Sequence, residues 1–231
     1  MIKRSIEEDK EINFLIKEKT KKFINIDTEE LKRIFSIYSK AKNGNSMIIL
    51  KMMSLQDISS QEFNYMKNFY VFKTVVLTEK NKVKESMSFP AINYFDMLKN
   101  DWKNSAVFKY FAFKTICLFI FQKKEDKQFF KKVIFLDLKS DELNDFFIIW
   151  EKIKNMISNN LLEIGGKNGF SVENFPKKDD SSIVHVRPHD TNSSEGKVLL
   201  PNGQRIMNYC FWLNNNFIEK KIMEVLKNEK Y

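Results

Sequence analysis

Two strongly apolar segments, residues 114–122 and 131–138, most constrain what this chain can fold into. Both have the length of a β-strand and are rich in β-branched and aromatic residues. Apolar runs of this kind are typical of strands that are covered on both faces. A charged loop, residues 123–127, joins them. The two segments therefore predict the buried centre of an α/β domain.

A second pair of strands is expected earlier in the chain, at residues 69–77 and 82–89. A short charged turn, residues 78–81, joins them, and Pro90 ends the second strand. Lys73 lies in the middle of the first strand among apolar residues. Its charge is therefore expected to emerge on one face of an apolar ribbon.

The remaining elements follow from helical periodicity and from capping residues. Asp27 or Thr28 can cap one helix, with Glu30 placed for a capping box, and Asp141 is expected to cap a long helix. We read the apolar stripe of that long helix as core and not as a cofactor site. A further strand is expected at 183–188 and a further apolar segment at 210–213. The expected helices are residues 5–23, 28–40, 46–55, 91–99, 141–159 and 217–228.

The composition bounds both the size and the partners of the protein. With 231 residues, of which 43% are hydrophobic, the chain can form one large domain or two small ones, and a single α/β domain is the simplest reading. A net charge of +9 favours an anionic partner, nucleic acid first and an acidic membrane second. The alternative is that the lysines reflect a biased composition with no binding role.

The cysteines and the chain start indicate a reducing, cytoplasmic setting. Cys117 and Cys210 both lie in apolar runs and read as core residues. With only two histidines in the chain, a zinc site lacks ligands. The first residues are too acidic for a signal peptide, and the longest apolar run, 115–121, is far shorter than a membrane span. We expect no membrane association.

Candidate contacts to an anionic partner gather near the C-terminus. His185, Arg187 and His189 alternate along one expected strand and therefore project to the same face, where they suit phosphate or guanine contacts. The alternative is that Arg187 pairs with an acid, Glu173 or Asp190, and that the histidines cap loops.

Other polar residues add weaker candidates. The loop after this strand supplies groups able to read base edges, although any exposed loop resembles it. Lys73 and Lys84 are expected to face a partner along the first ribbon, whereas Lys84 can also be a solvated charge. We read Trp102, Trp150 and Trp212 as core aromatics. The loop candidates are Asn192, Lys197, Gln204 and Arg205, and further phosphate contacts are possible at Lys40, Lys42 and Lys51.

The segment 183–218, IVHVRPHDTNSSEGKVLLPNGQRIMNYCFWLNNNFI, resembles the C-terminal part of the MutH family of GATC-directed DNA endonucleases. In that family an Arg-Pro motif on a strand, a loop and an aromatic-Trp/Tyr-Leu segment follow in this order. The chain is most similar to the C-terminal half of the Sau-type restriction enzymes. Further matching positions are 72–74, the run KESMSF at 84–89, Asp101-Trp102 with Ser105, Asn174-Phe175 and HVRPH at 185–189.

This resemblance covers nearly the whole chain and implies a fold. We expect a single MutH-like domain with a restriction-endonuclease-like mixed sheet flanked by helices. Residues 1–60 form its helical N-terminal part, and residues 61–231 form the sheet core with a C-terminal DNA-binding motif.

The resemblance also implies a metal site, which this chain does not reproduce. Cleaving members hold magnesium with a Glu on a helix, an Asp, and a Glu two residues before a Lys. Here Lys73 is present, but Val71 and Asn64 stand at the Glu and Asp positions, and residues 31–56 contain no acid. Without these ligands magnesium affinity is lost, so we expect no catalytic residue, no metal and no cofactor, with Lys73 a vestige.

Three hypotheses follow. The first is a catalytically silent, MutH-like protein that binds double-stranded DNA at GATC-like sites and assists a cleaving MutH-like chain or self-associates. The second is an active type II restriction endonuclease whose magnesium ligands have moved to Glu62, Asp57 or Glu85. The third is an interaction subunit without affinity for DNA.

Overall fold

The computed structural model describes residues 4–38, 44–53, 58–166, 169–189 and 197–228. It is a mixed α/β protein, as the sequence predicts, and it divides into two compact units. Unit 1 comprises Met1–Lys84, Phe113–Asp137 and Lys221–Tyr231, and unit 2 comprises Glu85–Ala112 and Leu138–Lys220. The expectation of a single domain stays a prediction. Within the described ranges, none of the helices combines the length and apolar character that a bilayer span requires.

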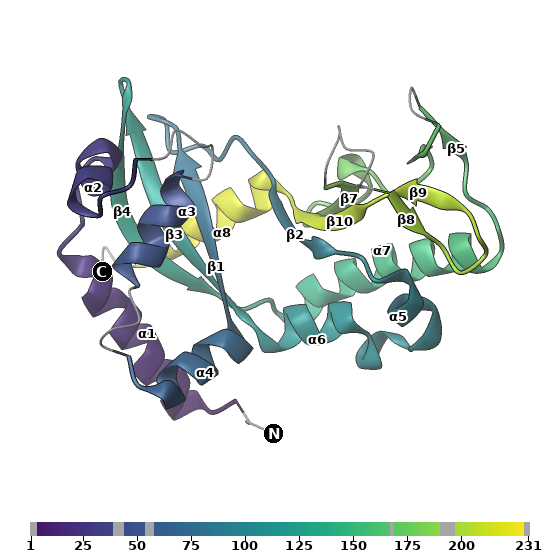
Figure 1. Cartoon of the computed structure of the whole chain (residues 1–231), viewed down its shortest axis with the longest axis horizontal. Helices are drawn as coiled ribbons and strands as arrows, with labels where there is room; N and C mark the ends of the chain where they lie inside the picture. The colour runs from purple at the N-terminus through teal and green to yellow at the C-terminus, as the bar shows by residue number, and fades with distance from the viewer. Residues whose placement is uncertain (1–3, 39–43, 54–57, 167–168, 190–196, 229–231) are drawn as a thin grey trace. The chain divides into compact units, whose positions relative to one another are not determined.

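Unit 1 is built on a mixed sheet with the strand order β1-β3-β4 (Figure 1). Strand β1 runs parallel to β3, with Lys73 opposite Leu118, and β3 is antiparallel to β4. The first eight residues of β3 are buried, which confirms the expectation for this segment, whereas β4 is only partly buried. The strands are β1 (Tyr70–Leu77), β3 (Thr115–Lys124) and β4 (Lys127–Leu136).

Four helices cover one face of this sheet. Apolar residues of α1, α2, α3 and α4 join one hydrophobic cluster with Phe119 and Phe121 of β3 and Phe130 of β4. Ser5 caps α1, and Asp27 caps α2 by accepting the N–H groups of Glu29 and Glu30, as expected. The helices are α1 (Ile6–Lys21), α2 (Thr28–Ile34), α3 (Gly44–Met52) and α4 (Ser60–Phe69), so α2 ends earlier than its predicted limit at residue 40.

The predicted pairing of the first two strands is wrong. Residues 82–86 form no strand, and their pairing with β1 is reduced to an isolated bridge between Leu77 and Val83. Strand β2 (Met87–Ala91) instead pairs with β10 in unit 2. Pro90 lies inside β2 and does not end it, because β2 is an edge strand, where a missing N–H costs no ladder bond.

Unit 2 contains an antiparallel sheet with the order β2-β10-β7, and α7 runs along one of its faces (Figure 1). Phe211 of β10 packs on Phe146 of α7, with ring centroids 5.9 Å apart. Two small hairpins, β5-β6 and β8-β9, complete the unit. Its strands are β2, β5 (Ile164–Gly165), β6 (Ser171–Val172), β7 (Val184–Pro188), β8 (Lys197–Leu199), β9 (Arg205–Met207) and β10 (Tyr209–Leu213).

The helices of unit 2 correct two details of the sequence reading. The long helix begins at Ser140, so Asp141 lies inside its first turn and Lys139 takes the N-cap position. Glu142 accepts the backbone N–H of Lys139 at 2.9 Å. The helix α6 was not expected from the sequence. The helices are α5 (Tyr94–Lys99), η2 (Trp102–Asn104), α6 (Ala106–Phe113), α7 (Ser140–Ser158), η3 (Lys178–Asp180) and the N-terminal part of α8 (Asn215–Asn228).

Both cysteines are buried and neither forms a disulfide, as expected for core residues. Burial raises the pKa of the Cys117 thiol well above its usual range, so it stays protonated and inert. Of the three tryptophans read as core, only Trp150 is fully enclosed, at 1% exposure. Trp102 and Trp212 are half-buried and have a face near solvent.

A polar cluster fixes the start of α1 to the ends of the unit 1 strands. The Arg4 guanidinium donates to Asp9 at 2.8 Å, to Asp137 at 3.0 Å and to the Thr115 hydroxyl at 2.6 Å. The second oxygen of Asp9 accepts bonds from the hydroxyls of Tyr65 and Tyr70. These two carboxylates therefore take part in holding the fold together.

We expect Arg4→Met to lower the free energy of unfolding by about 2 kcal/mol, because it leaves half-buried acceptors without their charged donor. Arg33→Met is the matched control, since its ion pair with Glu30 is exposed and contributes less than about 0.5 kcal/mol. Urea unfolding of both variants measures the difference. Equal losses would contradict the structural role of Arg4.

Candidate nucleic-acid interface

Lys73, which the resemblance assigns to the position of the nuclease metal site, lies in unit 1, on β1. Lys73 is half-buried and shares one face of the strand with Val71 and Val75, because side chains alternate along a strand. Asn64 lies on the preceding helix, α4, and its backbone carbonyl accepts a hydrogen bond from the Asn68 side chain. Valine offers no donor atom and asparagine no charge, so these residues do not fit a magnesium ion.

Of the three acids proposed as relocated ligands, Glu62 is already engaged in capping a helix. Glu62 accepts the N–H of Ser59 at 2.8 Å in a capping box, and this bonding lowers the pKa of its carboxyl. Glu85 belongs to unit 2, and Asp57 lies outside the described residues. In the part of the chain that the structure describes, no group of three or more His, Cys, Asp or Glu residues is placed to hold a metal ion.

In unit 2, the paired strands β7 and β10 bring several candidate contacts together. Trp212 lies opposite His185, and Cys210 lies opposite Arg187. The Arg187 guanidinium carbon sits 4.1 Å from the centroid of the Trp212 ring, a cation–π contact. Arg187 is exposed. His185 and Arg187 therefore share a face, as expected, and Trp212 lies beside both of them. His189, the third member of the predicted row, lies beyond the end of β7.

His185, in contrast, is buried and is not placed as a surface contact. It is 4% exposed, and its Nδ1 lies 2.5 Å from the side-chain oxygen of Asn214. The Asn214 amide donates to the carbonyl of Ser181 at 2.6 Å, so its oxygen must accept from His185. His185 thus holds the strand pair in place and is enclosed in the unit, which leaves Arg187 as the exposed group of the pair.

The alternative partners of Arg187 can be compared with this geometry. Glu173 accepts the N–H of Gly166 at 2.9 Å across the β5-β6 turn. Within the described residues the guanidinium forms no ion pair, and Asp190 lies outside them. Stacking on Trp212, which the sequence reading did not consider, is the contact that holds Arg187.

The remaining unit 2 candidates lie on and next to the β8-β9 hairpin. Lys197 and Arg205 are exposed, and the Lys197 ammonium sits 3.6 Å from the centroid of the Phe170 ring. The Gln204 side chain accepts from Asn202 at 2.8 Å. His189 is exposed and donates its backbone N–H to Asn208, between β9 and β10. The bond between His189 and Asn208 connects the end of β7 with the end of β9.

The other predicted contacts lie in unit 1 or outside the described residues. Lys73 and the exposed Lys84 belong to unit 1, and Lys51 is exposed on α3 in the same unit. Asn192, Lys40 and Lys42 lie outside the described residues. The contact role of every predicted residue stays a prediction.

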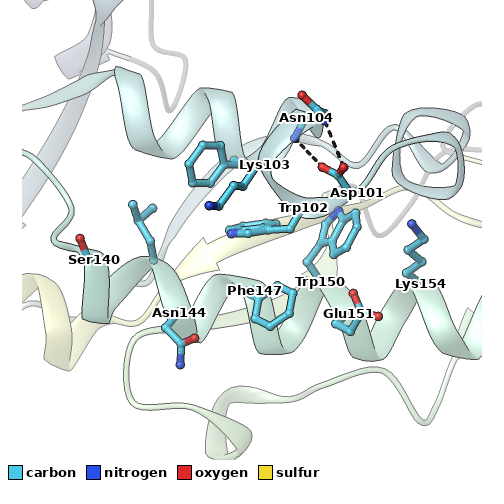
Figure 2. Close-up of a pocket in the computed structure, with 12 residues that line it drawn as sticks. Asp101, Trp102, Lys103, Asn104, Ser140, Asn144, Phe147, Trp150, Glu151 and Lys154 are labelled. Carbon is cyan, nitrogen blue, oxygen red and sulfur yellow. Dashed lines mark hydrogen bonds between the residues drawn. The ribbon is translucent and has the colours of Figure 1, made fainter.

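Unit 2 also has a groove of about 920 Å³ along α7, which is a weaker candidate for a nucleic-acid interface. Figure 2 shows Trp102 reaching toward Phe147 and Trp150 on α7, with Asp101 bonded to Asn104. The ring centroids of Trp102 and Trp150 are 5.6 Å apart. Two cations in its lining, Lys103 and Lys154, are balanced by Asp101 and Glu151, so the groove does not favour a polyanion.

The buried His185 predicts a pH-dependent stability. Burial is the main cause that lowers its pKa, partly offset by the bond to Asn214. The unfolded chain therefore binds a proton more readily than the folded one, and stability falls as the pH drops from about 6.5 through the lowered folded-state pKa.

Urea unfolding between about pH 5 and about pH 8 tests this dependence. His185→Gln keeps an N–H donor but cannot titrate, so its advantage over the parent protein should grow as the pH falls. His189→Gln, at the exposed histidine, is the matched control and should follow the parent curve. Parallel curves for the parent and His185→Gln would rule the prediction out.

No family model matches the chain. A comparison with characterised proteins finds similarity to the type II restriction enzyme Sau3AI of Staphylococcus aureus, with 28% identity over 257 residues. The similarity covers 94% of this chain and 52% of that enzyme, so the chain spans about half the length of this relative. Together with the mixed α/β architecture, it supports a restriction-endonuclease-like relationship.

Proposed function

We propose that this protein binds double-stranded DNA, at GATC-like sites, and does not cut it. The observation that carries the proposal is Arg187: an exposed guanidinium, stacked on Trp212, within the segment that resembles the DNA-binding motif of the MutH family. Arginine is the side chain best suited to guanine edges in the major groove and to phosphate oxygens.

The β8-β9 hairpin supports the same proposal. Lys197 and Arg205 add exposed positive charge to unit 2, and the polar side chain of Gln204 lies in the same hairpin. The net charge of +9 favours association with a polyanion through counterion release. Lys73, Lys84, His189 and Asn192 remain proposed contacts.

The proposed absence of DNA cleavage follows from the side chains near Lys73, which lack the carboxylates of a magnesium site. The resemblance implies a magnesium site held by negatively charged carboxylates, and the corresponding positions carry the uncharged Val71 and Asn64. Lys73 alone would offer a positive charge to a phosphate. A cleaving partner is therefore part of the proposal: a separate MutH-like chain, consistent with the similarity to about half of a larger enzyme.

An electrophoretic shift assay with GATC and scrambled duplexes at about 50 and about 200 mM salt tests the binding. We expect a shift at low salt that weakens steeply as salt is added, with the GATC duplex bound more tightly. Arg187→Ala should cost about 1–3 kcal/mol of binding free energy. Arg33→Ala, at an exposed arginine of unit 1 outside the proposed contacts, should cost little. No shift of either duplex at low salt would defeat the proposal and favour an interaction subunit without DNA affinity.

Plasmid DNA incubated with magnesium or manganese tests the proposed lack of cleavage. We expect intact plasmid, because the described residues near Lys73 offer no fitting ligand set. Specific fragments that vanish in Lys73→Ala would instead establish an active endonuclease with relocated ligands. Glu62→Gln is the informative companion, because loss of those fragments would identify this carboxylate as a ligand.

A further inference from the structure

Two of the cations proposed to contact DNA are held over aromatic rings, Arg187 over Trp212 and Lys197 over Phe170. We propose that Trp212 and Phe170 are positioning residues that fix these two charges on the unit 2 surface before the duplex arrives. This inference rests on the proposed function and assigns it two aromatic residues: Trp212, which the sequence indicated as a core residue, and Phe170, which the sequence did not single out.

The Trp212 ring is itself held firmly. It lies opposite His185 across the β7-β10 ladder, and the two rings are stacked at 25° with centroids 6.4 Å apart. His185 is locked in turn by its bond to Asn214. The indole Nε1 is enclosed and has no hydrogen-bond partner among the described residues, so packing alone sets the position of the ring.

Stacking leaves the donors of Arg187 available. A guanidinium over an indole uses its flat face for the cation–π contact, while its N–H bonds lie in the guanidinium plane and point away from the ring. Because Arg187 remains exposed, these donors can bond to a guanine edge or a phosphate without leaving the ring.

Phe170 is placed next to Lys197 by the backbone. Its carbonyl accepts the N–H of Met207 at 2.9 Å, and Met207 is the register partner of Lys197 in the β8-β9 hairpin. The hydrogen bond therefore brings the phenyl ring under the lysine, where the ammonium sits 3.6 Å from its centroid. A lysine held this way loses less conformational freedom when it meets a phosphate.

A cation–π contact elsewhere in the same unit provides a control. Lys154 lies 4.8 Å from the centroid of Trp150, but its ammonium donates to the carbonyl of Asn100 at 2.6 Å. It belongs to the groove along α7, whose charges balance. Lys154→Ala is therefore expected to leave DNA affinity unchanged.

Fluorescence anisotropy with a labelled GATC duplex, in a double-mutant cycle, tests the inference. Trp212→Leu should weaken binding about twofold to fivefold with an unchanged salt dependence, because the number of charges is unchanged. In an Arg187→Ala background the same change should have no effect. Trp212→Phe, which keeps a ring, should retain most of the affinity. Phe170→Leu and Lys197→Ala should be coupled in the same way.

Melting curves identify any variant that is not folded. If Trp212→Leu does not fold, the double-mutant cycle of Phe170 and Lys197 tests the inference by itself. Parent-like binding by the ring variants, or equal losses with and without their cations, would overturn the inference while the proposed function stands. Failure of the parent protein to bind either duplex at low salt would instead overturn the proposed function, and the inference with it.

Discussion

The parallel pairing of β1 with β3 is the constraint on which the rest of the structure depends. Parallel neighbours cannot be joined by a tight turn, so the chain must make a long excursion before it returns. Here the excursion runs from Leu77 to Thr115 and supplies β2, α5 and α6 of unit 2. Along the chain, the first segment of unit 2 is thus inserted between the β1 and β3 segments of unit 1.

Charge alone does not locate the candidate interface, because lysines are spread over the whole chain. Arg187 and Lys197 share two features: an aromatic ring lies beneath each cation, and each cation projects from a strand that is paired in a ladder. The aromatic groove along α7 has comparable rings but balanced charges. The comparison favours the β7-β10 and β8-β9 surface for a polyanion, since rings and net positive charge occur there together.

The nuclease-like features of the sequence and the chemistry they would need do not coincide. Lys73 stands in its strand as expected, but the neighbouring positions offer Val71 and Asn64, and Glu62 is engaged in capping α4. Asp9 and Asp137 of unit 1 are both bonded to Arg4. We therefore propose DNA binding without cleavage as the function that the described residues support best.

The sequence by itself determined the α/β class, most helices, the two apolar strands and the burial of both cysteines, because these depend on local periodicity and on hydrophobic runs. It also placed His185 and Arg187 on one face. Only the tertiary structure decided that β2 pairs with β10, that His185 is enclosed by Asn214, and that Trp212 and Phe170 lie under the cations. Those facts depend on strand partners and register between segments distant in sequence, and alternation along a single strand carries no information about which residue will lie opposite.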